Sequence, residues 1–352
     1  MGNALIEHFP QAMALFAELD DVLQQLPDAP SWSIVDEISQ SRPAEHLRQP
    51  EFSQPLTTAL QLVIHDIYKQ WGVDADVAVG HSSGEFAAAY ASGLISKATA
   101  IKAAYYCGWA AKSCQGNSES PVGMLSVATE AETIKSYLDN AEGDVTIACF
   151  NGPRALALSG TVPALTKIKE QLVQAGHYAT FIHADLAYHS RFMNDICETF
   201  ESRLKANTSA TPTTNPTASM YSTVTGELMS GAADAAYWTK NLLSPVLFEQ
   251  TISTMLNSPN APNVLIEIGP AGVLAGPVTE IKTRLGGAAE GVQYLRSLNR
   301  GPSAISPILH TAGKLFMAGH DVNLARVNEP RSGPESLTTI DLPNNPESES
   351  KA

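Results

Sequence analysis

The chain has 352 residues, of which 44% are hydrophobic, and its formal net charge is −14. Its length suggests about two structural units or one large domain with an insertion. The acidic balance argues against nucleic acid as a partner. No apolar run approaches the roughly 18 residues of a transmembrane helix, and the N-terminus lacks the charged and apolar regions of a signal peptide. We therefore expect a cytoplasmic protein without a membrane partner.

Four segments are predicted as helices from their apolar spacing or helix-compatible composition: residues 1–26, 54–72, 85–93 and 97–115. Residues 73–79 carry three valines and end at Gly80, which predicts a short buried strand directly before the third helix. The cysteines Cys107, Cys114, Cys149 and Cys197 show no C-x-x-C spacing. We therefore expect reduced thiols, with neither a zinc site nor a disulfide framework. We also expect no bound cofactor and no other metal.

Residues 122–183 change in character. Two predicted helices alternate here with the strand sequences GMLSVA and VTIACFNGPRALALSG. This β-α-β-β-α pattern predicts a small inserted subdomain of split βαβ type. Residues 1–121 and 184–312 would then form the large subdomain. The segment 313–352 ends in a sequence rich in Ser, Pro and Glu, so we expect a partly disordered linker and tail.

The segment Gly80-His81-Ser82-Ser83-Gly84 matches G-x-S-x-G. In a sharp strand-to-helix turn, this spacing lifts the serine hydroxyl clear of the sheet, and glycine two positions to either side avoids collisions. The following helix N-terminus offers free N–H groups where an oxyanion would form. A motif this short also arises by chance, but the predicted strand before it and helix after it favour Ser82 as a nucleophile.

A serine nucleophile needs a base, and His189 is the strongest candidate. It follows an apolar stretch at the return from the insert, although it could also be a solvent-facing loop residue. His183 is the local rival, whereas His81 is too close to Ser82 in sequence. No acid stands out as a third member, so a backbone carbonyl could orient the imidazole. We interpret Asp185 and Asp195 as structural.

Several motifs together resemble the acyltransferase domain of fungal iterative, highly reducing polyketide synthases, which is similar to malonyl-CoA:acyl-carrier-protein transacylases. They occur in the same order along nearly the whole chain: GHSSGE, GMLSV, IACFNGP, LAYHS, MYSTVTGELM, YWTKNLLSPVLF and VLIEIGPAGVLAGPV. The resemblance implies an α/β fold, with an α/β-hydrolase-like large subdomain and an inserted ferredoxin-like small subdomain. It also implies ping-pong transfer through an acyl-serine, with substrates on coenzyme A or on the phosphopantetheine of an acyl carrier protein.

The resemblance also assigns residues. Ser82 would be the nucleophile, His189 the general base and the Ser83 N–H an oxyanion donor. Asn151 would lie near the active-site histidine in a supporting role. The residues that would shape the substrate site are His81, Cys107, Met124, Asn151 and Tyr188.

Three departures from the family pattern affect the expected chemistry. The family begins with a strand that ends in G-Q-G-x-Q, and this chain aligns just after it. Either that strand is absent or the sequence is truncated, and we expect a substitute oxyanion donor or slower chemistry. Cys107 stands where malonyl-selective members carry the arginine that grips the malonyl carboxylate. Neither Lys112 nor Arg191 is an obvious substitute, so we expect a neutral acyl group, although Cys107 could also be a core residue of a decayed domain. Ala271 and Leu247 replace a common histidine and a common arginine.

The main functional hypothesis is a free-standing, trans-acting acyltransferase of a polyketide biosynthetic pathway, with an acyl carrier protein as partner. Three alternatives stay open. The chain could be a hydrolase that releases or edits acyl thioesters. It could be a malonyl transferase that uses another cation in place of the arginine. It could also be an inactive remnant that serves as a scaffold.

Overall fold

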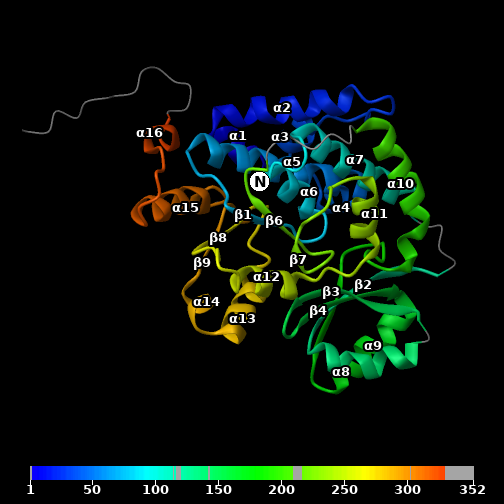
Figure 1. The fold of residues 1–352 in the computed structure, drawn as a ribbon. Helices are drawn as coiled ribbons and strands as arrows, with labels where there is room; N and C mark the ends of the chain where they lie inside the picture. The colour runs from blue at the N-terminus through cyan, green and yellow to red at the C-terminus, as the bar shows by residue number, and fades with distance from the viewer. Residues whose placement is uncertain are drawn as a thin grey trace, which may run out of the picture.

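The computed structural model describes residues 2–113, 115, 120–141, 143–208, 216–301 and 303–329. A large, mainly helical subdomain lies beside a small subdomain whose sheet is covered on one face by two helices (Figure 1). This is the α/β arrangement that the resemblance implies. None of the helices among the described residues combines the length and the hydropathy that a transmembrane span requires.

The core of the large subdomain is a layer of packed helices. The long helix α5, Pro50–Gln70, lies against α7, Lys97–Ser113, and both bury most of their small and apolar residues. The predicted helix over residues 1–26 is split, because Pro10 starts a second helix. The remaining helices of the first part of the chain are α1 Gly2–His8, α2 Pro10–Gln24, α3 Ile34–Ser39, α4 Ala44–Arg48 and α6 Gly84–Ala91.

The strands of the large subdomain form two small sheets. In the first, β1, Val77–Val79, pairs in parallel with β6, Ser219–Ser222, and β6 pairs with β7, Glu227–Leu228. In the second, β8, Val264–Glu267, pairs in parallel with β9, Gln293–Arg296. The predicted strand over 73–79 is therefore shorter than expected, but it ends where the motif begins. That position places the turn with Ser82 at the carboxyl end of a parallel strand, where α/β folds commonly build their sites.

The small subdomain has the predicted ferredoxin-like form. Its strands are β2 Val122–Ala128, β3 Val145–Gly152, β4 Ala155–Thr161 and β5 Tyr178–Ile182. They pair in the order β3-β4-β2-β5 and are antiparallel throughout. Helices α8, Ala131–Leu138, and α9, Val162–Gln174, pack on this sheet through Ile134, Leu165 and Leu172. All these elements fall within 122–183, and β5 adds a last strand that the sequence pattern did not indicate.

The C-terminal third returns to the large subdomain. Its helices are α10 Asn194–Asn207, α11 Ala235–Leu243, α12 Phe248–Leu256, α13 Ala275–Leu285, α14 Ala288–Gly291, α15 Ser306–Met317 and α16 Leu324–Val327. The predicted boundary at residue 312 between the large subdomain and the tail falls inside helix α15. The helix continues past it because Leu315 is buried on the same helix face as Ala312. The predicted tail therefore begins inside a packed helix, and its residues 330–352 lie outside the described ranges.

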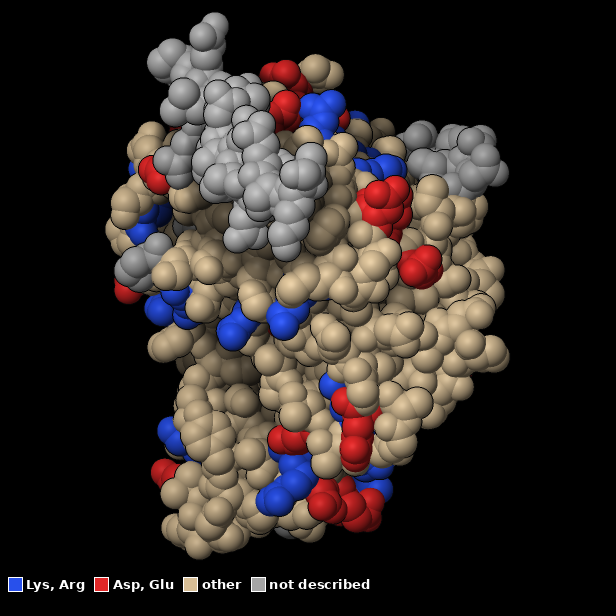
Figure 2. All heavy atoms as spheres, turned by 90° about the vertical axis from the view of Figure 1, so that its left-hand side faces the viewer, with Lys and Arg blue, Asp and Glu red and all other residues tan. Residues whose placement is uncertain are grey.

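Surface charge is dispersed on the face that carries α15 and α16. On the described part of this face, Lys and Arg alternate with Asp and Glu in small groups between wide uncharged areas (Figure 2). The described part of this face therefore shows no broad patch of a single charge sign.

Candidate active site

The turn between β1 and α6 holds Ser82 in a strained backbone conformation. Its φ of 56° lies in the left-handed region, which non-glycine residues rarely adopt. Gly80 makes the turn possible, because a Cβ there would lie 2.2 Å from the Glu85 backbone nitrogen. The expectation that Gly84 is equally constrained is wrong. A Cβ at Gly84 would meet only Gln61 Nε2, at 3.8 Å, so this side of the motif has room.

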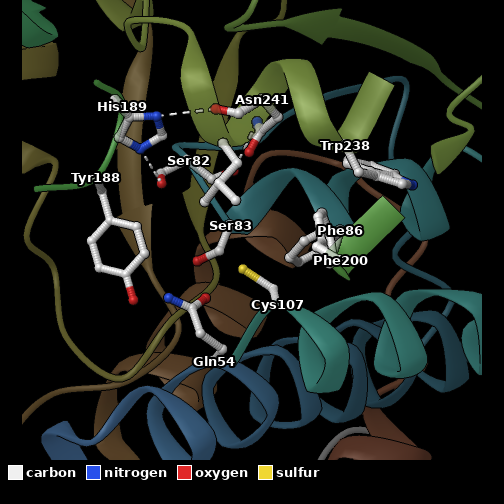
Figure 3. Close-up of a pocket in the computed structure, with 11 residues that line it drawn as sticks. Gln54, Ser82, Ser83, Phe86, Cys107, Tyr188, His189, Phe200, Trp238 and Asn241 are labelled. Carbon is white, nitrogen blue, oxygen red and sulfur yellow. Dashed lines mark hydrogen bonds between the residues drawn. The ribbon is translucent and has the colours of Figure 1, made fainter. Parts of the chain in front are cut away.

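The structure brings Ser82 and His189 together across 107 residues of sequence. Ser82 Oγ and His189 Nε2 are 2.7 Å apart (Figure 3). His189 also has a positive φ, of 59°, and among the described residues only it and Ser82 do so without being glycine. Strained residues of this kind concentrate at functional sites. The predicted base therefore lies within hydrogen-bond reach of the predicted nucleophile.

Backbone carbonyls orient the imidazole. His189 Nδ1 donates to the carbonyl oxygens of Asn241 and Ser244, both at 3.0 Å. This arrangement leaves Nε2 free to accept the Ser82 proton. Asp185 and Asp195 are exposed, and neither is among the hydrogen-bond partners of the ring within the described residues. The expectation that a carbonyl replaces the acid of a triad agrees with this geometry.

Burial keeps His189 neutral. Only 3% of its surface is exposed, and desolvation, followed by the proximity of His81, lowers its pKa to about 4. The two accepting carbonyls favour the protonated ring but do not outweigh the burial. At neutral pH the imidazole is therefore unprotonated and can act as a base.

This lowered pKa predicts the pH dependence of acyl-enzyme formation. We expect the rate to stay level from about pH 8 down to about pH 5 and to halve near pH 4, whereas an ordinary histidine would halve it near 6.5. Single-turnover acylation across this range measures the midpoint. Unfolded His189 binds protons more readily than the folded residue, so stability also falls as the pH drops below about 6.5. Circular dichroism must therefore show which samples are folded, and a midpoint near 6.5 in folded protein would contradict the expectation.

The Ser83 N–H is placed as an oxyanion donor. Ser83 directly precedes α6, so its N–H lies at the positive end of the helix dipole. Within the described part of the chain this N–H makes no hydrogen bond, while the next three N–H groups bond to carbonyls of the turn. It is thus available to a developing negative charge beside Ser82.

A pocket without a formal charge opens beside this pair. Its walls include Ser82, Ser83, Cys107, Tyr188 and His189, as predicted (Figure 3). The other lining residues come from α5, α6, α10 and α11: Gln54, Phe86, Phe200, Trp238, Asn241 and Leu242. Among the residues that the structure describes, no Lys, Arg, Asp or Glu lines this pocket.

Cys107 lines the pocket with an uncharged side chain. It is 4% exposed, and burial raises the pKa of its thiol to about 12, so it carries no charge at neutral pH. The two cations considered as substitutes are engaged elsewhere. Lys112 pairs with Glu51, and the exposed Arg191 pairs with Asp144.

Three of the predicted substrate residues do not line this pocket. His81 Nε2 and Asn151 Oδ1 are 2.6 Å apart, and His81 also packs edge-on against Phe248. Asn151 therefore supports His81 rather than His189. Met124 lies in β2, in a buried apolar cluster shared with Val246, because its side chain faces the junction of the subdomains. Met124 was predicted to shape the substrate site, but it is not among the residues that line the pocket.

The comparisons with known proteins agree with this geometry. Residues 1–296 match the family model described as the acyl transferase domain. The chain belongs to the acyl transferase domain family. It is thus an acyltransferase of the serine–histidine type, and the resemblance to fungal polyketide synthase acyltransferase domains is confirmed.

Two curated relatives show the scale of the match. The chain is 43% identical over 348 residues to a highly reducing polyketide synthase of Eupenicillium brefeldianum. It is 44% identical over 349 residues to a highly reducing polyketide synthase of Arthrinium phaeospermum. Each alignment covers 98% of this chain but only 14% of the relative, so the chain spans about a seventh of the length of each of these relatives.

Two solved structures share the fold. The acyltransferase domain from the second module of the salinomycin polyketide synthase has a TM-score of 0.80 and 26% identity, covering 97% of this chain and 75% of that chain. A loading acyltransferase from the avermectin polyketide synthase has a TM-score of 0.77 and 24% identity, covering 90% of this chain and 95% of that chain. The second likeness is one of fold alone.

Proposed function

We propose that this acyltransferase moves a neutral acyl group from a coenzyme A or carrier-protein thioester to a second acceptor, through an ester on Ser82, in polyketide biosynthesis. The observation that carries this proposal is the 2.7 Å contact between Ser82 Oγ and His189 Nε2 beside a pocket without a formal charge. The family membership and the polyketide synthase relatives support the setting.

The geometry supports a two-step reaction. His189 Nε2 takes the Ser82 hydroxyl proton while Oγ attacks the thioester carbonyl carbon, and the Ser83 N–H donates to the carbonyl oxygen. The C–S bond then breaks, and the thiol leaves with the proton from His189. In the second step an acceptor hydroxyl or thiol gives its proton to His189 and attacks the ester carbonyl carbon. The bond from that carbon to Ser82 Oγ then breaks, and His189 returns the proton to Oγ.

The preference for a neutral acyl group follows from the pocket walls. A malonyl carboxylate placed among Phe86, Cys107 and Trp238 would lose its water without meeting a cation. Burying an unpaired charge in this way costs several kcal/mol. A butyryl group of similar length has no such charge and would bury apolar surface instead.

A trans-acting role is the remaining part of the proposal. The serine, the histidine and the lining of the pocket all belong to this chain, which supports acylation of Ser82 within it. The carrier protein that delivers or receives the acyl group would then be a separate chain.

Intact-mass analysis after incubation with matched butyryl and malonyl thioesters tests the proposal. We expect butyryl to acylate the protein at least about 100-fold faster, which corresponds to about 2.7 kcal/mol. Equal or faster acylation by malonyl would overturn the neutral-acyl assignment. A Cys107→Ala variant should keep the adduct, because the acylated group is Ser82 and not this buried thiol.

The same acyl-enzyme distinguishes transfer from hydrolysis. With a separate carrier protein present, we expect the acyl group to appear on its phosphopantetheine thiol and the ester on Ser82 to decay faster. Free acid released at the same rate with and without the carrier would instead identify a hydrolase and contradict the transferase role.

A further inference from the structure

A buried carboxyl group that the proposed reaction does not use contacts the residues that support the catalytic pair. Glu85 is in the first turn of α6, three residues after Ser82, and it is 0% exposed. None of the ion pairs among the described residues includes it. Burial raises its pKa, and its hydrogen-bond donors partly offset that effect. A buried carboxyl group without a cation is costly, so its environment needs an explanation.

One oxygen of Glu85 is tied to the turn that carries Ser82. Glu85 Oε1 accepts the Thr223 N–H at 2.6 Å and lies 2.9 Å from Thr223 Oγ1. The same hydroxyl lies 3.0 Å from the carbonyl oxygen of Gly80, which begins the turn. Glu85 and Thr223 together therefore hold the first residue of the turn against β6.

The other oxygen is tied to the support of His189. Asn241 Nδ2 donates to Glu85 Oε2 at 2.9 Å, and the Tyr237 hydroxyl donates to the same oxygen at 2.7 Å. The carbonyl oxygen of Asn241 accepts the His189 Nδ1 proton. Glu85 thus holds, by its side chain, the residue whose backbone orients the imidazole.

From these contacts we infer that Glu85 is a positioning residue. It connects the Ser82 turn to Asn241 and so fixes the position of Ser82 Oγ relative to His189 Nε2. The inference rests on the proposed roles of Ser82 and His189. Asn241 Nδ2 also lies 3.4 Å from the carbonyl oxygen of Ser82. Because the connection from Glu85 to His189 runs through the Asn241 amide, removing either the carboxylate or that amide should displace His189 relative to Ser82. Asn241→Ala removes the amide and keeps the backbone carbonyl.

The test measures the reactivity of Ser82 with a small fluorophosphonate, which forms a bond from Oγ to phosphorus as fluoride leaves and His189 takes the proton. We expect Glu85→Gln and Asn241→Ala each to slow labelling of folded protein by about ten- to a hundredfold, as displaced reacting groups do. The double variant should be no more than a few fold slower than Asn241→Ala alone, because that substitution already breaks the connection through Glu85.

A second readout separates positioning from general destabilisation. In single-turnover acylation of Glu85→Gln by a butyryl thioester, the maximal rate should fall while the half-saturating concentration stays unchanged, because Glu85 does not line the pocket. Asp66→Asn is the matched control. Asp66 is a buried carboxylate that Tyr90 and Lys97 contact, and its hydrogen bonds do not reach His189. This variant should lose stability on heating but label at the wild-type rate.

The outcomes distinguish the inference from the proposed function. Absence of labelling in the wild type would overturn the roles of Ser82 and His189. Wild-type labelling with undiminished rates in both single variants would overturn only the positioning role, as would additive losses in the double variant. If Glu85→Gln does not fold, a wild-type rate in Asn241→Ala decides against the inference by itself.

Discussion

Ser82→Ala is expected to lower the rate of acyl transfer by about 10⁴-fold or more and to abolish the acyl adduct. The hydroxyl is the only group placed both 2.7 Å from the base and next to the free Ser83 N–H within the described site. When a serine nucleophile of this type is removed, its histidine partner has nothing to activate, so losses reach many orders of magnitude. Intact-mass analysis and single-turnover kinetics with a butyryl thioester measure both effects.

Ser96→Ala is the control for this substitution. Ser96 also lies just before a helix, but its hydroxyl is exposed and contacts only Thr99. It should form the adduct at the wild-type rate. Persistence of the adduct in Ser82→Ala would show that another group, such as a thiol, carries the acyl chain, and the proposed mechanism would fail.

His189→Gln is expected to slow acylation by about 10⁴-fold while the protein still folds. The glutamine amide can occupy part of the buried site but cannot accept a proton from Ser82 at neutral pH. The serine remains, so a small amount of adduct should accumulate over long incubation. Time courses of adduct formation by intact mass separate this slow acylation from the complete loss expected in Ser82→Ala.

His183→Gln tests the rival assignment. His183 is exposed and six residues before His189, and it makes no hydrogen bond to Ser82. We expect its variant to acylate normally. Normal acylation in His189→Gln together with loss in His183→Gln would reverse the assignment of the base.

The local parts of the site could be predicted from the sequence. A strand, a G-x-S-x-G turn and a helix are adjacent in the chain, so their pattern places Ser82 without knowledge of the rest of the fold. The small subdomain was also predictable, because its elements follow one another within 62 residues, from 122 to 183. His189 could be named from its position after the insert and from the LAYHS motif.

The supports of the site could not be predicted in this way. Asn241 acts on His189 through its backbone carbonyl, which every residue possesses, so its residue type gives no signal. Glu85 looks like an ordinary acidic residue in a first helical turn, and its partners Thr223 and Asn241 are more than 130 residues away in sequence. Met124 was predicted to shape the substrate site because it belongs to a family motif. In the structure it packs in the apolar core between the subdomains instead.

The left-handed backbone at Ser82 and His189 bears on the hypothesis of a decayed scaffold. A non-glycine residue in this conformation destabilises the folded state by about 1 kcal/mol, and glycine would relieve that strain at either position. A chain selected only to remain folded would gain stability by exchanging both residues. Keeping a strained serine and a strained histidine within 2.7 Å of each other has a benefit only where the hydroxyl is put to chemical use.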